Sequence, residues 1–360
     1  MNAPERWEAG SEFHWWLPEM PFTPLPWLPK GELFGSGRDA LRMVVLHGIT
    51  HRKWKCLWIP SYFCPEVVAS LLSLGIWIKS YADSPLNLEF VPPSDLRVGD
   101  AILVVNFFGL RRQPALIASL QQQQIEVIED HTHDLGSVWA QHSQADWWVA
   151  SLRKTLPLPD GGILWSPRGH RIPVPPGVTP ERQIASLQKL AGMLLKTMYL
   201  LNYPVEKERF HSFLISGEAM IAAGEISGMP SWTQALLATF PVDRWRRVRA
   251  ANQATLATTL WQIPWVKILE PENPQENCPF SGILLFDTQG RRDFVYQQLL
   301  AERIYPAILW RFTSSIPGIR PEDMDFSQRM LSIHCDMRYS TADMLKIADS
   351  IRIFGEAYTP

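Results

Sequence analysis

Lys154 and Asp130 are the residues whose types and positions point most directly to chemistry. Lys154 lies shortly after the apolar run 147–150, and Asp130 lies shortly after the apolar-rich stretch 125–128. A lysine buried where a strand ends has a lowered pKa and can form a Schiff base. An acid in a similar position can hold the proton on the nitrogen of a pyridine ring. The pair therefore predicts a site for pyridoxal 5'-phosphate, although each residue alone also fits a solvated surface lysine or a capping acid.

Three further features could complete such a site. Ser151 precedes Lys154 by three positions and could bind a phosphate group. Gly37 and Arg38 open a predicted helix, whose first N–H groups favour an anion. His133 could contact the 3-oxygen of the cofactor or stack on its ring, and otherwise it is an ordinary loop histidine. No metal ligand set is expected.

An aromatic pair follows another predicted strand. If that strand continues, Tyr62 and Phe63 point to opposite sides, so only one of them can stack on the cofactor. The sequence does not decide between the two. Further along, Asp160 precedes a Gly-Gly pair that allows the backbone to turn close to a ligand.

Composition excludes several classes of function. The chain has 360 residues, is 46% hydrophobic and carries a formal net charge of −2. It can therefore bury a sizeable core, and nothing in its charge favours nucleic acid or an anionic membrane surface. Four cysteines form no CxxC pair, which is typical of a reduced protein. With no signal-like start and no apolar run of membrane-spanning length, we expect a cytoplasmic protein that acts on small molecules.

From residue 34 to about 170 the pattern alternates between strand and helix. The run 101–105 is continuously apolar, which is typical of a strand covered on both faces in a parallel sheet. We therefore predict an α/β domain with a mostly parallel central sheet flanked by helices. The expected strands are 57–59, 76–81, 101–108, 125–129, 146–150 and 162–165, and the expected helices are 39–50, 66–74 and 114–123.

The chain is expected to divide into three parts. Residues 1–33 are rich in proline and predict an extended arm, residues 34–230 form the large domain with a helical insertion at 181–228, and residues 231–360 form a smaller C-terminal α+β domain. In the last part we expect a long helix at 231–260, strands at 283–286, 307–310 and 330–334, a helix at 291–301, and a final helix. Ser340 and Asp343 have the spacing of a capping box for that final helix.

Several segments, taken in order, resemble the DegT/DnrJ/StrS sugar aminotransferases, which are fold-type I pyridoxal-phosphate enzymes. These segments are 36–41 (SGRDAL), 60–62 (PSY), 106–109 (NFFG), 127–137 (VIEDHTHDLGS) and 151–162 (SLRKTLPLPDGG). The segment 330–334 and the helix after it resemble the closing strand and helix of the family. The resemblance covers residues 34–165 clearly and 231–355 loosely.

The resemblance implies a role for each site residue. Lys154 would carry the cofactor as an internal aldimine, Asp130 would pair with the ring nitrogen, and His133 would contact the cofactor's oxygen. The phosphate ligands would be Gly37, Arg38 and Ser151. Members of the family are usually homodimers with sites at the interface, and they transfer an amino group from glutamate or glutamine to keto-sugars on nucleotide carriers, as in polysaccharide biosynthesis.

The sequence also departs from the family pattern. Arg38 and Asp39 replace a threonine and a small residue, the segment 157–160 (PLPD) is stiffer than the usual turn, and the helical segment 181–228 has no clear counterpart. The family's Asn-x-Arg-Met segment is represented only by 227–231 (SGMPS). Two alternatives therefore stay open. One is another fold-type I reaction, such as a lyase or desulfurase that uses Cys64 or Cys335; the other is a non-catalytic homologue that binds cofactor or sugar and acts through partners.

Overall fold

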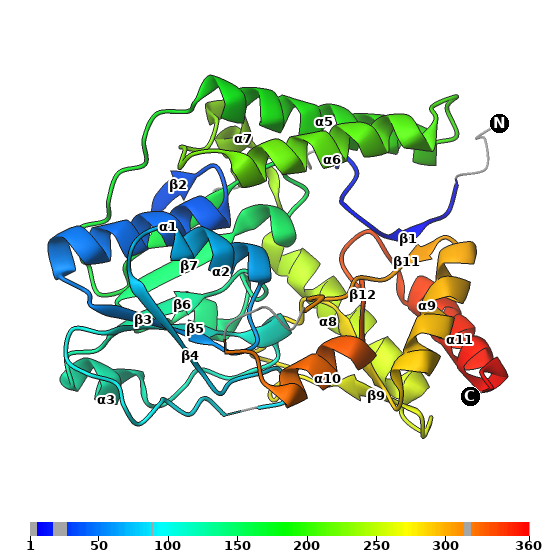
Figure 1. The fold of residues 1–360 in the computed structure, drawn as a ribbon. Coiled ribbons are helices and arrows are strands. Elements are labelled where there is room, and N and C mark those ends of the chain that lie inside the picture. The colour runs from blue at the N-terminus through cyan, green and yellow to red at the C-terminus, as the bar shows by residue number, and fades with distance from the viewer. Residues whose placement is uncertain (1–5, 17–26, 88, 313–317, 360) are drawn as a thin grey trace.

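A seven-stranded sheet forms the centre of the large domain in the computed structural model, which describes residues 6–16, 27–87, 89–312 and 318–359 (Figure 1). Its strand order is β2-β8-β7-β6-β5-β3-β4; β7, β6, β5, β3 and β4 are parallel, while β8 and β2 run antiparallel to their neighbours at one edge. The strands are β2 (Glu32–Phe34), β3 (Cys56–Pro60), β4 (Trp77–Tyr81), β5 (Ala101–Val105), β6 (Glu126–Asp130), β7 (Trp147–Ser151) and β8 (Gly162–Trp165). The predicted fold class is confirmed.

Alternating residues of the central strands pack against two layers of helices. Leu103 of β5 belongs to the apolar cluster that includes α1 (Gly37–His47) and α2 (Pro65–Leu72). Its neighbour Ile102 packs with α3 (Ile117–Gln122) and α4 (Val138–Gln141) on the other face. This period-2 alternation buries both faces, so the carboxyl ends of the strands are the place where polar side chains can meet.

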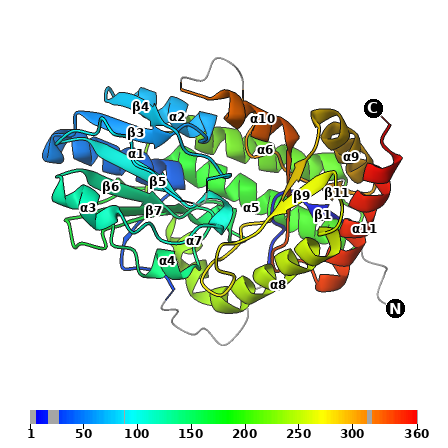
Figure 2. The same cartoon turned by 90° about the horizontal axis from the view of Figure 1, so that it is seen from below.

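A smaller antiparallel sheet lies in the C-terminal part of the chain (Figure 2). Its order is β12-β10-β9, with β9 (Val266–Leu269), β10 (Gly282–Phe286) and β12 (Met330–Ile333). The helices of this part are α8 (Val242–Leu260), α9 (Gln289–Ala301), α10 (Pro321–Arg329) and α11 (Thr341–Ala357). The capping box of the final helix is confirmed, because Ser340 Oγ accepts from the N–H of Asp343 and Asp343 Oδ2 accepts from the N–H of Ser340.

Two predicted elements of this part are wrong. The long helix 231–260 is broken into α7 (Ser231–Leu236) and α8, because Pro241 constrains the chain between them and offers no N–H for a continuous helix. The expected strand at 307–310 is reduced to a single bridge between Ala307 and Ser332. A short strand, β11 (Ile304–Tyr305), lies just before it. Strand β9 and helix α10 were not predicted.

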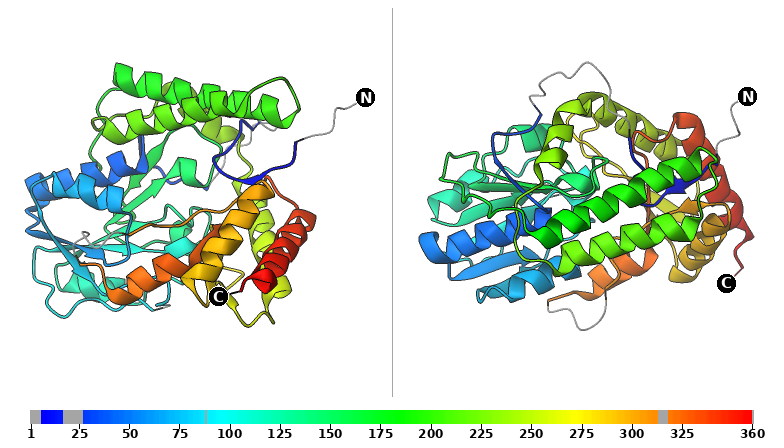
Figure 3. Two further views of the ribbon diagram at one scale, coloured as in Figure 1. Left: turned by 45° about the vertical axis from the view of Figure 1, so that its right-hand side comes forward. Right: turned by 90° about the horizontal axis from the view of Figure 1, so that it is seen from above.

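The expected helical insertion is a pair of helices that lie side by side across one face of the molecule (Figure 3). Helix α5 (Pro180–Leu200) begins with Thr179 as its N-cap, and α6 (Lys207–Ala223) packs closely against it. The two backbones approach at glycines: a Cβ on Gly217 would lie 2.6 Å from Lys189 Cγ. We call this pair the helical hairpin.

The described part of the N-terminal segment runs along the body of the protein. Strand β1 (Ala9–Gly10) pairs in parallel with β11. Arg338 Nη1 donates hydrogen bonds to the carbonyls of Ser11 and Glu12, both at 3.2 Å. Residues 1–5 and 17–26 of the predicted arm lie outside the described residues. None of the helices in the described part of the chain combines the length and apolar character needed to cross a bilayer.

Candidate active site

A cavity of about 650 Å³ opens at the carboxyl ends of the parallel strands. The last residues of β5, β6 and β7, which are Val105, Asp130 and Ser151, all line it. The volume lies within the ~300–1,000 Å³ that is usual for small-molecule sites. The cavity extends from the sheet to the helical hairpin, the N-terminal arm and the C-terminal part.

All but one of the residues predicted from the sequence line this single cavity. They are Gly37, Arg38, Phe63, Asp130, His133, Ser151 and Lys154. Tyr62 is the exception: its ring is fully buried and packs against the rings of Phe107 and Phe326, and its hydroxyl donates to the carbonyl of Leu309. Of the aromatic pair, Phe63 therefore faces the cavity and Tyr62 belongs to the core.

Lys154 ends the short 3-10 turn Leu152–Lys154 that directly follows β7. Protein surrounds the side chain of Lys154 on most sides, but much of its surface is accessible because the side chain lines the cavity. The positive charge of neighbouring Arg153 and burial both lower the pKa of Lys154. A lowered pKa increases the fraction of the neutral amine, which is the nucleophilic form.

Asp130 is placed by the last position of β6. Its Oδ1 accepts a hydrogen bond of 2.9 Å from the backbone N–H of Thr132, which fixes the carboxylate at the strand end. Burial raises the pKa of Asp130. A buried carboxylate whose pKa is raised is strongly stabilised by a positively charged N–H donor, since such a donor offsets the cost of burying the negative charge.

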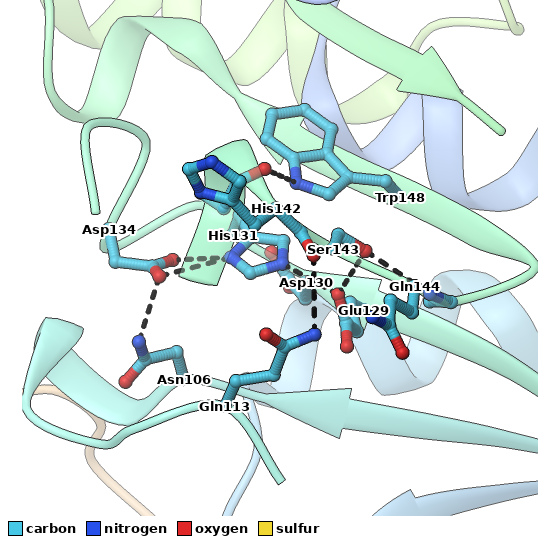
Figure 4. Close-up of polar contacts among 12 residues, drawn as sticks. Asn106, Gln113, Glu129, Asp130, His131, Asp134, His142, Ser143, Gln144 and Trp148 are labelled. Atoms are coloured by element: carbon cyan, nitrogen blue, oxygen red, sulfur yellow. Dashed lines mark hydrogen bonds and ion pairs between the residues drawn. The ribbon is translucent and has the colours of Figure 1, made fainter. Parts of the chain in front are cut away.

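A buried polar network that was not predicted lies next to Asp130 (Figure 4). His131 Nδ1 is 2.9 Å from Asp134 Oδ1 and its Nε2 is 3.0 Å from Glu129 Oε2, and its ring stacks on Trp148. Burial lowers the pKa of His131, but the carboxylates of Asp134 and Glu129 outweigh it and raise the pKa to about 10. Asn106 Nδ2 also donates to Asp134 at 2.8 Å, so the network ties the end of β6 to the loop after β5.

His133 stands among aromatic rings at the edge of the cavity. Its ring stacks on Phe108 at 5.4 Å between centroids and lies 5.9 Å from Trp310. Burial and the charge of Lys154 lower the pKa of His133 to about 3, so the imidazole is neutral near pH 7. Its Nδ1 is buried and has no hydrogen-bond partner within the described residues. A buried atom of this kind is a position where a ligand's polar atom would be satisfied.

The start of α1 meets the end of β7 at one side of the cavity. Gly37 approaches Ser151 so closely that a Cβ on the glycine would lie 2.6 Å from Ser151 Cβ. Ser36 caps the helix by accepting from the N–H of Asp39, and the first helical residues, Gly37 and Arg38, line the cavity. Arg38 donates from Nη1 to the carbonyl of Ala222 at 3.1 Å, and it has no ion pair with any described residue.

Asp39 follows Arg38 directly but does not line the cavity. Its Oδ2 accepts from Arg182 Nη2 at 2.7 Å, and both side chains are almost fully buried. Burial nevertheless raises the pKa of Asp39 to about 6. The turn at Gly161 has a left-handed φ of +112° and its N–H bonds to Gly35, so it supports the start of α1 and does not itself line the cavity.

Sequence reasoning missed the charged residues that close the cavity from the other side. The helical hairpin contributes Lys189 and Glu218, and Glu218 bonds to both Arg153 at 2.7 Å and Lys189 at 3.0 Å. Glu12 of the arm also pairs with Lys189. No local motif marks these residues, because each is brought to the site by packing between elements far apart in the chain.

No protein-family model matches the sequence, and no curated protein sequence matches it either. Solved structures do match, over most of the chain. DesI with its TDP-sugar product is 16% identical, with a TM-score of 0.60, covering 91% of this chain and 81% of that chain. A DegT/DnrJ/EryC1/StrS aminotransferase from Brucella abortus is 15% identical, with a TM-score of 0.54, covering 90% of this chain and 85% of that chain. A sugar aminotransferase from Streptococcus pneumoniae, Spr1654, described as putative and in its PLP form, is 12% identical, with a TM-score of 0.61, covering 92% of this chain and 88% of that chain.

The protein therefore has the fold of the sugar aminotransferases, a fold of pyridoxal-phosphate enzymes. The resemblance noted in the sequence is confirmed at the level of the fold. At these identities it is the fold that is shared, and the chemistry of this chain rests on its own residues.

Proposed function

We propose that the protein is a pyridoxal-phosphate-dependent aminotransferase that transfers an amino group from an amino acid to a keto-sugar. One observation carries the proposal. A lysine, an acid, a neutral histidine and a close glycine–serine contact, predicted from separate parts of the sequence, all line one cavity at the ends of adjacent strands.

The residues present fit the cofactor. The buried Nδ1 of His133 lacks a partner, the pKa of Asp130 is raised by burial, and Arg38 has no carboxylate partner among the described residues. Each of these is a group that an aromatic ligand with a phosphate, an oxygen and a protonated nitrogen would complete. Gly37, Arg38 and Ser151 would hold the phosphate, and Phe63 would contact the ring.

Pyridoxal phosphate supplies a Schiff-base linkage and an electron sink when it is bound. The protein's own residues do the rest. Lys154 provides an amine whose pKa is lowered, so it can take and return a proton at the reacting carbon. Asp130, whose pKa is raised by burial, would hold a proton on the ring nitrogen, and His133, neutral near pH 7, would hydrogen-bond the ring oxygen.

The proposal extends to glutamate or glutamine as the donor and to a nucleotide-linked keto-sugar as the acceptor. The structural likeness to DesI, which was solved with a TDP-sugar product, supports the acceptor class. The cavity also reaches well beyond the predicted cofactor residues, to Lys189, Glu218 and Arg249, which leaves a polar wall for a second substrate. A homodimer in the cytoplasm, with large domain 34–230 and C-terminal domain 231–360, belongs to the same proposal.

A lyase or desulfurase that uses a cysteine is less well supported. Cys64 lines the cavity, but burial and the neighbouring Glu66 raise the pKa of its thiol to about 12. Its thiol donates to Glu66 Oε2 at 3.1 Å, and the reactive form of cysteine is the thiolate. Cys335 is fully buried, its pKa is also about 12, and it is not among the cavity-lining residues.

The test uses purified full-length protein titrated with pyridoxal phosphate. We expect uptake with a visible Schiff-base absorption band that Lys154→Ala abolishes. The matched control is Lys55→Ala, which removes an exposed lysine and should leave the band intact. Addition of glutamate or glutamine should then bleach the band, and a keto-sugar nucleotide should restore it.

The outcomes separate the alternatives. A protein that takes up no pyridoxal phosphate refutes the proposal. A stable band that no amino donor changes would instead indicate a non-catalytic cofactor-binding homologue. Release of sulfide or another fragment from the donor without amino transfer would indicate the lyase class.

A further inference from the structure

Three of the six lysines and arginines that line the cavity already have an acidic partner. Arg153 and Lys189 bond to Glu218, and Arg338 binds both oxygens of Asp336 at 2.8 Å. Two arginines that line the same cavity have no ion pair with any residue that the structure describes, namely Arg38 and Arg249. The first lies beside Gly37, where the phosphate is proposed to bind. The second needs a different explanation.

Arg249 comes from the middle of α8 and is only 5% exposed. Its Nη2 donates to the carbonyl of Thr155 at 3.2 Å, and its buried Nε has no partner within the described residues. Thr155 directly follows Lys154, so this guanidinium is attached to the backbone next to the proposed reactive lysine. The charge of Asp336 also acts on Arg249, but both oxygens of Asp336 are bonded to Arg338.

A buried guanidinium without an ion pair is costly, because its charge has lost water and has no directly bonded opposite charge. It also presents a planar fork of N–H donors that matches a carboxylate. Arg249 therefore provides a preformed binding position for an anion inside the cavity. The phosphate of the cofactor does not fill this position if it binds at Gly37 and Ser151.

We propose that Arg249 binds a carboxylate of the amino donor, an inference that rests on the aminotransferase function proposed above. An α-amino acid carries its carboxylate on the carbon whose nitrogen is transferred, so that group must come to lie near Lys154. Arg249 is fixed one residue from Lys154 through Thr155. Its burial favours a compact carboxylate over the diphosphate of a nucleotide sugar, which carries a nucleoside along with it.

The experiment compares Arg249→Gln and Arg249→Lys with Arg247→Gln in the pyridoxal-phosphate-loaded protein. Arg247 lies on the same helix, is exposed and has no polar partner among the described residues, so it is a matched control. Binding of glutarate, a dicarboxylate that has no amino group and cannot react, is measured by calorimetry. The apparent dissociation constant of glutamate is measured from single-turnover bleaching of the visible band.

We expect Arg249→Gln to raise the dissociation constants of both ligands by about 10- to 100-fold, because one or more charge-assisted hydrogen bonds are lost. Arg249→Lys should keep part of the affinity because it keeps the charge but not the fork, and Arg247→Gln should bind like the unaltered protein. The bleaching rate at saturating glutamate should change less than the apparent dissociation constant. Equal pyridoxal-phosphate uptake and melting temperature check that each variant is folded, and if Arg249→Gln fails that check Arg249→Lys carries the test.

Two results would overturn the inference while leaving the aminotransferase in place. One is unchanged glutarate and glutamate binding in folded Arg249 variants. The other is a loss confined to the KM of the keto-sugar nucleotide, which would assign Arg249 to an anion of the acceptor. Failure of the unaltered protein to take up pyridoxal phosphate would instead refute the proposed function itself.

Discussion

Gly37 offers a direct test of how the end of β7 and the start of α1 build the phosphate site. In Gly37→Ala the new Cβ would lie 2.6 Å from Ser151 Cβ and 2.7 Å from Ser151 Cα. Neither neighbour is the end of a flexible side chain, so α1 and Ser151 must move apart. Ordinary contact begins near 3.4 Å, which requires a displacement of about 0.8 Å.

A displacement of this size is large on the scale of a hydrogen bond. An N–H···O contact of about 2.9 Å that is stretched by the same amount exceeds 3.6 Å and no longer counts as a bond. A lost hydrogen bond to a charged group is worth about 1.5–3 kcal/mol, so the dissociation constant of pyridoxal phosphate should rise by about 10- to 150-fold. The overpacked contact should also cost about 1–3 kcal/mol of stability.

The assay is a titration of cofactor-free protein with pyridoxal phosphate, followed by its absorbance, together with a thermal scan. Gly177→Ala serves as the control, because a Cβ there meets no atom within 4 Å. Unchanged cofactor affinity and melting temperature in Gly37→Ala would refute the idea that this close approach shapes the site. Loss of stability with unchanged affinity would show that the helix start does not bind the phosphate.

Three further changes probe one residue that lines the cavity and two buried ion-paired residues beside it. Asp130→Asn should keep cofactor binding but lower kcat by about a hundredfold or more, because the amide cannot hold the ring proton as the carboxylate does; steady-state kinetics check this. His131 has its pKa raised from 6.5 to about 10 (burial opposes the rise, and Asp134 and Glu129 cause it), so its contribution to stability is complete below about pH 6.5 and is lost as the pH rises toward 10. His131→Asn should therefore lower the melting temperature at pH 7 and flatten its decline between pH 7 and 10, and a parallel decline in both proteins would count against this. Asp39→Asn should destabilise by about 3–5 kcal/mol, measured by urea unfolding, because it leaves Arg182 buried without its counterion.

The sequence was sufficient to predict the sheet and the part of the site that the sheet builds. Continuous apolar runs mark strands buried on both faces, and functional groups in such folds follow those runs at the carboxyl ends. Asp130 and Ser151 lie at the last positions of their strands, and Lys154 follows within one turn, so local pattern and site geometry coincide. Tyr62 shows the limit of the same reasoning: the side on which it falls depends on whether Phe107 and Phe326 surround it, and those contacts are not local.

The C-terminal part was harder to predict for physical reasons. Its strands are short and alternate with helices of weak amphipathic pattern, so apolar spacing does not define their limits. Strand β9 has only four residues, and the segment 307–310 has strand-like composition but pairs through one bridge at Ala307. In such segments tertiary pairing overrides local preference.

The helical hairpin is where the sequence departs most from the family pattern, and it also completes the cavity. Glu218 accepts from Arg153 and from Lys189, and Lys189 in turn pairs with Glu12 of the arm. This chain of alternating charges begins at Arg153, beside Lys154, and ends at Glu12 of the arm, which lies 177 residues from Lys189 along the sequence. Loss of Glu218 would remove the acidic partner of Arg153 and one of the two acidic partners of the buried Lys189, so the positions of the hairpin and the arm are linked. The wall proposed for a second substrate is therefore built by elements whose positions depend on one another, and this is why the sequence pattern indicates the proposed cofactor more clearly than it indicates the proposed acceptor.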